Sequence, residues 1–288
     1  MPVWVMLRHN LVHMRDLLIG EFLIFALFGA LFLGLLLFLK SRGSYRFRIR
    51  EQIGTPKQIG REAFNSTRAV FIYNAIQIVM RLFILAFGFV LTFDARLPLW
   101  EVALSFPLII IGHDTYFYWT HRVMHSKALF RLMHWEHHRS KGPTVFTSYS
   151  FSMLESVVQG AYPILYVALL PATFPTLIFF YSVAILHDVT VHSGVDLFPR
   201  WAIIGKPFGW ICGTIHHDMH HEVGQMNYGL YTRFWDKLMG TEHPKFEAVY
   251  DYVHSPGNDG QAYRRVLHGR PPRVVEAPVA APEPEPVG

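Results

Sequence analysis

The sequence predicts an all-α integral membrane protein, and two observations support this fold class. Hydrophobic residues make up 51% of the 288 residues and charged residues only 16%, whereas charged residues are about a quarter of a typical soluble domain. The chain also contains four apolar segments, each long enough for one or two helices across a hydrocarbon core of about 30 Å. We therefore expect an integral membrane helical bundle of about four to five membrane helices.

Three of these segments predict single membrane helices. The first is Leu17–Leu39, which carries one charge and is too long for a signal peptide. The second is Ala69–Phe93, whose polar side chains should face protein because charged groups are costly in lipid. The third runs from Leu99 to about Trp119, and Pro107 should kink it.

The fourth segment, Phe151–Leu186, is long enough for two helices and contains Pro171 and Pro175. Proline ends or breaks a helix because it lacks the backbone N–H and restricts the residue before it. We therefore expect a helical hairpin that turns at Ala172–Phe174.

The distribution of cations predicts the orientation of these helices. Cations accumulate between the first two spans, whereas residues 94–98 carry one; those of the first loop are Lys40, Arg42, Arg46, Arg48, Arg50, Lys57 and Arg61. Because cations concentrate in cytoplasmic loops, the first loop should be cytoplasmic. Tracing the spans from there brings both histidine-rich stretches, around residues 121–138 and 216–221, to the cytoplasmic face.

Twelve of the 17 histidines lie between His113 and His221. Eight of them form three groups with the spacing of one helix face, which directs their imidazoles into a shared space. These groups are HRVMH with His121 and His125, HWEHH with His134, His137 and His138, and HDMHH with His217, His220 and His221. Eight ligands are more than one ion accepts, so we expect two metals, with His187 and His192 as further candidate ligands. Imidazole suits zinc, copper, iron and nickel, so the ligands alone leave the metal open.

In this order and with these spacings, the three groups resemble the histidine boxes of the fatty acid hydroxylase and sterol desaturase superfamily, which are membrane non-haem diiron enzymes. The resemblance covers roughly residues 100–245 and includes HDTYFYW before the first box and NYGLYTRFWDKLMGT after the third. It implies two bound iron ions, or zinc in a purified preparation. The ligands that it implies are His121, His125, His134, His137, His138, His217, His220 and His221. His192 and His187 both match an additional histidine region of the family, and the choice between them stays open.

The resemblance implies a monooxygenase-type oxidoreductase that uses dioxygen and external electrons to hydroxylate or desaturate a C–H bond of a lipid. The substrate would be sterol-like, fatty acyl or carotenoid. Electrons would come from a separate ferredoxin- or cytochrome-type donor with an NAD(P)H reductase. The alternative is a non-redox, histidine-rich membrane protein that binds or transports metal. Transport would place ligands within the spans, whereas the boxes follow the spans.

Acidic side chains beside the boxes are candidates to accept hydrogen bonds from the N–H groups of the ligands, the alternative being helix capping and surface ion pairs. These candidates are Asp114, Glu136, Asp188, Asp218, Glu222 and Asp236.

We expect three parts in the chain. Residues 1–62 form an N-terminal anchor helix and a basic cytoplasmic loop, residues 63–254 a membrane-embedded histidine-box catalytic domain, and residues 255–288 a disordered, proline-rich tail. Cys212 is the only cysteine, which excludes an intramolecular disulfide and a cysteine-based metal cluster. No motif supports binding of nucleic acid. Together these features predict a membrane bundle with a cytoplasmic helical cap that carries a histidine-rich dimetal site.

Overall fold

The computed structural model describes residues 48–50, 54–87, 98–170, 173–205 and 209–269, together with isolated positions between 19 and 38. The predicted anchor helix Leu17–Leu39 falls almost wholly outside the described residues, as does the last part of the predicted tail.

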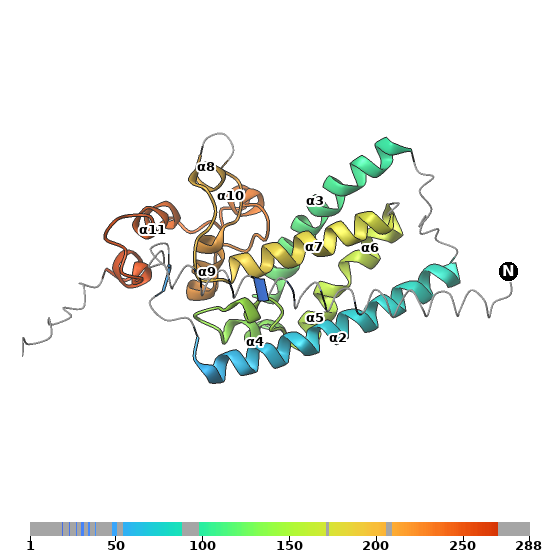
Figure 1. Cartoon of the computed structure of the whole chain (residues 1–288), viewed down its shortest axis with the longest axis horizontal. Helices are drawn as coiled ribbons and strands as arrows, with labels where there is room; N and C mark the ends of the chain where they lie inside the picture. The colour runs from blue at the N-terminus through green and yellow to red at the C-terminus, as the bar shows by residue number, and fades with distance from the viewer. Residues whose placement is uncertain are drawn as a thin grey trace, which may run out of the picture.

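All regular elements of this described part are helices, and its only β-type pairings are three isolated bridges. This confirms the all-α prediction. The three long helices are α2 (Pro56–Phe87), α3 (Leu99–Met124) and α7 (Phe174–Val191). In Figure 1, α3 and α7 lie toward the right, and α2 runs below them and extends toward the opposite end. Shorter helices form a cap at the other end, and these are α8 (Arg200–Ile203), α9 (Thr214–Val223), α10 (Phe234–Leu238) and α11 (Phe246–Val253).

Local sequence signals explain where the long helices begin. Pro56 opens α2, where its fixed φ suits the first turn, and the Thr55 hydroxyl accepts a hydrogen bond from the backbone N–H of Gln58. The α3 helix follows Pro98, runs through Pro107 and continues to Met124. The first histidine box therefore lies on the same helix as the predicted third span.

The predicted hairpin differs from the structure in its first arm. The second arm, α7, begins near the predicted turn, with Thr173 as its N-cap. The first arm is two short helices, α5 (Met153–Gly160) and α6 (Tyr162–Leu169). Pro163 explains the break, because a continuous helix would set its ring against the carbonyl of the residue four positions earlier.

None of the helices in the described ranges combines the length and the apolar character that crossing a bilayer requires. The prediction of four to five membrane helices is therefore not confirmed by this part of the chain.

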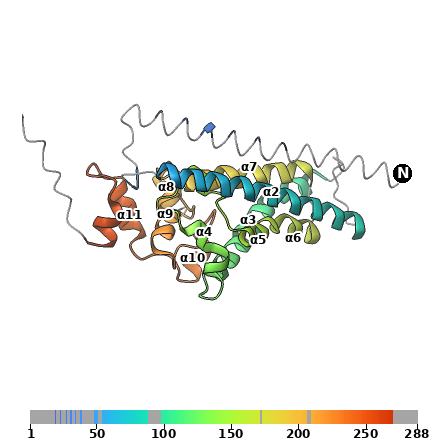
Figure 2. The same ribbon diagram turned by 90° about the horizontal axis from the view of Figure 1, so that it is seen from below.

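The long helices pack in pairs, with α2 against α5 and α3 against α7 and α6 (Figure 2). Gly160 allows the close approach of α5 to α2, because a Cβ at this position would lie 2.8 Å from the Tyr73 ring. This packing places the ends of α3, α5 and α7 beside one another, where the histidines lie.

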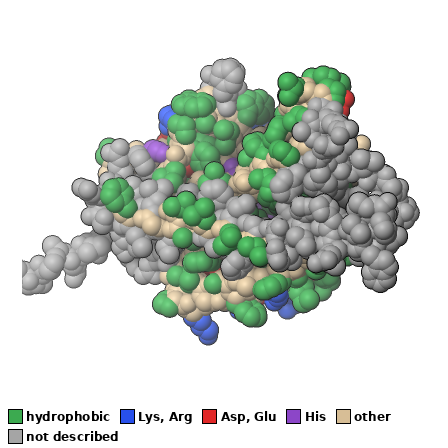
Figure 3. All heavy atoms as spheres, turned by 45° about the vertical axis from the view of Figure 1, so that its right-hand side comes forward, with side chains coloured by type: hydrophobic (Ala, Val, Ile, Leu, Met, Phe, Trp, Pro, Cys, Tyr) green, Lys and Arg blue, Asp and Glu red, His purple; other side chains and the backbone are tan. Residues whose placement is uncertain are grey.

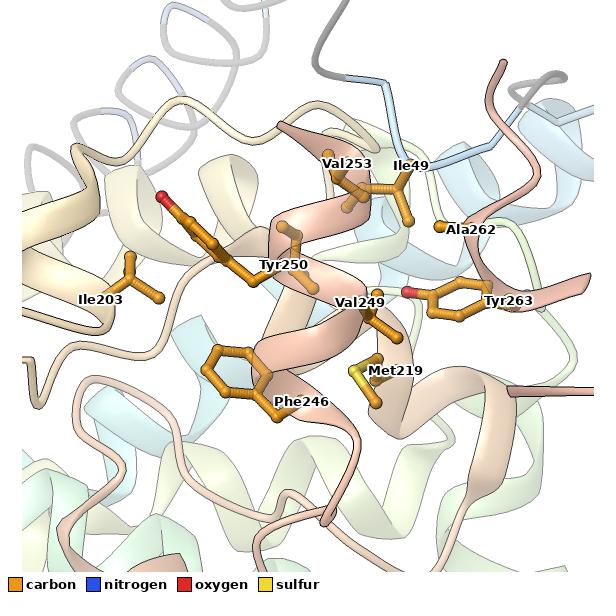
Figure 4. Packing of buried hydrophobic residues seen from close by; sticks show 10 residues of the cluster. Ile49, Ile203, Met219, Phe246, Val249, Tyr250, Val253, Ala262 and Tyr263 are labelled. Carbon is orange, nitrogen blue, oxygen red and sulfur yellow. The ribbon is translucent and has the colours of Figure 1, made fainter. Parts of the chain in front are cut away.

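The cap has its own hydrophobic core around α11. Phe246, Val249, Tyr250 and Val253 pack against Met219 of α9 (Figure 4). This core anchors the helix that carries the third histidine box.

Part of the predicted tail belongs to this core. Residues 263–267 form the π-helix η4 (Tyr263–Leu267), and Ala262 and Tyr263 are buried against the cap. Residues 255–269 are therefore folded, contrary to the prediction of a disordered tail from residue 255, because an aromatic side chain finds an apolar partner surface. The other predicted boundary, residue 62, falls inside α2.

Candidate metal centre

Four segments bring nine of the ten predicted ligands together as two groups of ring nitrogens, with the candidate ligand atoms of each group all within 4.8 Å of one another. The five-histidine group consists of His121, His125, His134, His138 and His220, and the four-histidine group of His137, His192, His217 and His221. His187 is in neither group, and its Nε2 lies 2.7 Å from the carbonyl oxygen of Leu230. The three boxes therefore meet, although 100 positions separate the first and last of their histidines, His121 and His221.

The second box has a geometry that its spacing did not predict. Instead of one α-helix, His134 ends the π-helix η2 (Phe130–His134), and α4 (Trp135–His138) follows directly. His134 and His138 join the five-histidine group, whereas His137 joins the four-histidine group. A π-helical turn is frequent at functional sites, and here one short segment supplies both groups.

The third box is helical as predicted. His217 and His221 are one turn apart on α9 and both enter the four-histidine group, whereas His220 turns to the five-histidine group. His192 is the C-cap residue of α7 and completes the four-histidine group. Helix geometry, at about 3.6 residues per turn, sets which ring enters which group.

The facing nitrogen atoms have the separations expected of ligands on one ion. In the five-histidine group, Nε2 of His121 lies 2.9 Å from Nε2 of His134. In the four-histidine group, Nε2 of His217 lies 2.9 Å from Nε2 of His192 and 3.2 Å from Nε2 of His221. Two nitrogens held about 2.1 Å from one ion at tetrahedral or octahedral angles are about 3.0–3.4 Å apart.

Backbone acceptors fix the tautomers of several of these rings. Nδ1 of His121 lies 2.9 Å from the carbonyl oxygen of Tyr228, and Nδ1 of His220 lies 2.7 Å from that of Met226. A neutral ring that donates from Nδ1 keeps a lone pair on Nε2. Nδ1 of His192 likewise faces the carbonyl oxygen of Asp188 at 2.7 Å. Within each group, the Nε2 lone pairs therefore point at one another, an arrangement that a bound cation satisfies.

The rings are also held neutral, as metal ligands must be. Burial, and then the charges of neighbouring histidines, lowers the pKa of His217 and His221 well below the usual value for histidine. Burial lowers the pKa of His220 to about 3, although its bond to the Met226 carbonyl opposes the change. Nε2 of His125 is buried and has no hydrogen-bond partner within the described ranges. Donor type, spacing and charge thus fit two transition-metal ions.

One acidic partner of the ligands was missed by the sequence analysis. Oε1 of Glu155, on α5, lies 2.6 Å from Nδ1 of His134, and both side chains are almost fully buried. Glu155 follows Ser152 by three positions, and Ser152 caps α5 by accepting a hydrogen bond from the Glu155 backbone N–H. The spacing thus looks like that of an ordinary helix start, and only the tertiary structure shows the role of the carboxylate.

Most of the acidic residues predicted to support the ligands have other partners. Asp188 lies 3.3 Å from Nδ1 of His192, as predicted, and Asp236 lies 3.4 Å from Nε2 of His216. The other four carboxylates make contacts elsewhere: Asp218 and Glu222 pair with Arg50, Glu136 with Arg139, and Asp114 accepts backbone N–H groups of Tyr231 and Thr232.

A largely aromatic cavity adjoins both histidine groups. It lies between α2, α3, α5, α6 and α7. Two of its lining rings touch ligands, since Phe117 lies 4.9 Å from the His121 ring and Phe151 lies 5.2 Å from the His137 ring, between centroids. Asp188, beside His192, also lines it. An apolar molecule in this cavity would lie against both groups.

Comparisons with known proteins agree with this geometry. A family model described as fatty acid hydroxylase matches residues 106–241, which include all three boxes. Lathosterol oxidase of Homo sapiens is 29% identical over 143 residues, which are 50% of this chain and 46% of the relative. Cholesterol 25-hydroxylase of Rattus norvegicus is 33% identical over 135 residues, 46% of this chain and 45% of the relative.

A Delta(7)-sterol 5(6)-desaturase of Leptosphaeria maculans is 29% identical over 142 residues, 49% of this chain and 38% of the relative. The chain therefore spans less than half the length of these curated relatives. No solved structure matches the chain.

Proposed function

We propose that this chain is a non-haem diiron oxidoreductase of the fatty acid hydroxylase and sterol desaturase superfamily, which hydroxylates or desaturates a C–H bond of a lipid. The match of residues 106–241 to the fatty acid hydroxylase family model supports this proposal. The main support for this proposal is the pair of adjoining histidine groups, in each of which ring nitrogens face one another. Two irons held there would supply the activation of dioxygen needed to oxidise an unreactive C–H bond. The alternative of a non-redox metal-binding or transport protein has no support among the relatives.

The residues of the chain position and shield this chemistry. The nine grouped histidines hold the ions, while the carboxylate of Glu155 and the carbonyl oxygens of Tyr228 and Met226 orient three of the rings. Phe117 and Phe151 line the cavity beside the ligands and would keep water from the reacting carbon. The lipid would bind with its apolar body in the cavity.

We also propose that the protein is a multi-pass integral membrane protein with its metal site facing the cytoplasm. Large apolar side chains are exposed on α2, α3 and α6, including Phe71 at 70%, Leu99 at 87% and Leu169 at 81%, and hydrophobic side chains gather in several patches on the described part of the face seen in Figure 3. Apolar surface of this extent indicates contact with lipid or another protein. Resistance of the protein to carbonate extraction from membranes tests this part of the proposal, and release into the supernatant contradicts it.

The proposal includes dioxygen and a separate electron donor as partners. A polar surface groove beside α4 is lined by four arginines and one glutamate: Arg61, Arg68, Arg131, Arg139 and Glu136. Its positive balance suits the acidic surface of a ferredoxin- or cytochrome-type donor, since complementary charge steers association. Electrons delivered there would enter beside the second histidine box.

The decisive experiment combines metal analysis with lipid analysis. The purified chain should hold two iron atoms, or two zinc atoms, and cells that express it with an electron donor should contain a lipid that has gained one oxygen or lost two hydrogens by mass spectrometry. His137→Ala and His220→Ala should each lose metal and product, whereas His268→Ala, at a surface histidine paired with Glu222, should retain both. Full metal content and product in both cluster variants would refute the assignment.

A further inference from the structure

We propose that Gln159, in the wall of the aromatic cavity, binds a hydroxyl group of a neutral lipid substrate. This inference rests on the proposed function and specifies which lipids fit the site. It follows from an unpaired buried amide, from the charges of the cavity and from the position of Gln159 on α5.

The amide of Gln159 is buried without a partner. The side chain is 9% exposed, and neither Nε2 nor Oε1 forms a hydrogen bond within the described part of the chain. A buried donor and a buried acceptor left unpaired in one side chain are unfavourable, and most such groups in folded proteins are satisfied. Because Gln159 lines the cavity, a molecule bound there is positioned to pair with both atoms.

The chemistry of the amide selects a hydroxyl group. An amide offers N–H donors and a carbonyl acceptor, and a hydroxyl both donates and accepts one or more hydrogen bonds. One hydroxyl therefore satisfies Nε2 and Oε1 together, whereas a ketone or ether oxygen pairs only with Nε2.

The charges of the cavity disfavour an anionic group. The residues that line it include one carboxylate, Asp188, and neither lysine nor arginine. A carboxylate or phosphate held at Gln159 would lie near Asp188 without a lysine or arginine in the cavity wall to compensate its charge, which is costly in a buried site. The other lining side chains are mainly aromatic or aliphatic, such as Phe151 and Phe180. The cavity thus suits an apolar, uncharged body with one hydroxyl.

The position of Gln159 relates this hydroxyl to the metal groups. Glu155 and Gln159 are four residues apart on α5, so they share a helix face and lie one turn, or about 6 Å, apart along the axis. Glu155 contacts the His134 ring directly. A hydroxyl on Gln159 would therefore lie about one helical turn beyond this contact and fix which carbon of the lipid faces the ions.

Equilibrium binding to the metal-loaded, full-length chain tests the proposal without turnover. The probes are cholesterol, its deoxy analogue cholest-5-ene and its anionic analogue cholesterol sulfate, with the pair 1-hexadecanol and hexadecane as a second hydroxyl comparison. The wild type should bind the hydroxyl member of at least one pair about tenfold or more tightly than its deoxy partner, since a site that lacks its hydrogen-bond partner rejects the analogue. Cholesterol sulfate should bind more weakly than cholesterol.

Gln159→Leu should weaken binding of the hydroxyl probe to the level of the deoxy probe and leave binding of the deoxy probe unchanged. Gln225→Leu, the same substitution at an exposed position, is the matched control and should preserve the discrimination. Equal binding of both members of each pair to the wild type, no binding of either hydroxyl probe, or full discrimination in Gln159→Leu would overturn the proposal. If the chain discriminates between the probes but binds no metal or oxidises no lipid, only the proposed function is refuted. If it oxidises lipid but does not discriminate between the probes, only this inference is refuted.

Discussion

Replacing Glu155 with glutamine tests whether the buried carboxylate strengthens the five-histidine group. Glutamine keeps the size of the side chain and a neutral acceptor for Nδ1 of His134, so it removes only the charge from the 2.6 Å contact. A hydrogen bond to a charged group contributes roughly 1.5–3 kcal/mol, about twice a neutral one. Removing the charge should therefore cost about 1.4 kcal/mol, which is about tenfold in affinity.

Competition with a graded series of chelators, followed by metal analysis, measures this change. Glu155→Gln should lose one of its two ions at an about tenfold lower chelator concentration than the wild type. The matched control is Glu136→Gln, inside the second box, whose carboxylate pairs with Arg139 at the surface and should leave affinity nearly unchanged. Equal metal retention in Glu155→Gln and Glu136→Gln would refute the role of Glu155.

Three further predictions concern individual side chains. His187→Ala should retain both metals while His192→Ala loses one by metal analysis, because only His192 enters a histidine group; the reverse result would contradict the assignment. Arg50→Met should lower the melting temperature of the purified protein by several degrees, because it removes the cation that two carboxylates of α9 share, one of which is fully buried; an unchanged melting temperature would show that the pairs are unimportant. Burial lowers the pKa of His254, but the hydrogen bond to Asp196 outweighs burial, so the pKa is raised overall. The pair of His254 with Asp196 should therefore stabilise the fold fully below about pH 6.5, the pKa of histidine in the unfolded chain. This stabilisation should be lost as the pH rises through the higher pKa of His254 in the folded protein. Thermal unfolding across pH 5–9 should show this loss in the wild type and not in His254→Leu.

The predictions that rest on helical periodicity were the most reliable ones. The i, i+4 spacing of HRVMH and HDMHH corresponds to the ends of α3 and α9, and the ligands converge as two groups. These features are local or follow from the ordered recurrence of the boxes. The all-α character was predictable for the same reason, because long apolar segments indicate the helices that they form, whereas the predicted membrane spans are not confirmed by the described residues.

The remaining features depend on contacts between distant residues. Nothing local distinguishes Glu155 as a partner of His134 from a glutamate in the first turn of a helix, and nothing local sends His137 to a different group from His134. Tyr263 likewise follows a stretch rich in glycine and polar residues, and only the apolar surface of the cap explains why it is buried. Periodicity cannot report such pairings, since they arise from packing.

The short segment before α2 sets the order in which the molecule can assemble. Ile49 donates its backbone N–H to Gly194, Arg50 forms a β-bridge with Gln261, and the Arg50 guanidinium contacts Asp218 on α9. These partners lie far along the chain, and pairings between distant positions form slowly. The outer side of α9 thus stays open until residue 261 has left the ribosome. We therefore expect chains cut short before that residue to hold α9, and the three candidate ligands on it, less firmly than the whole chain.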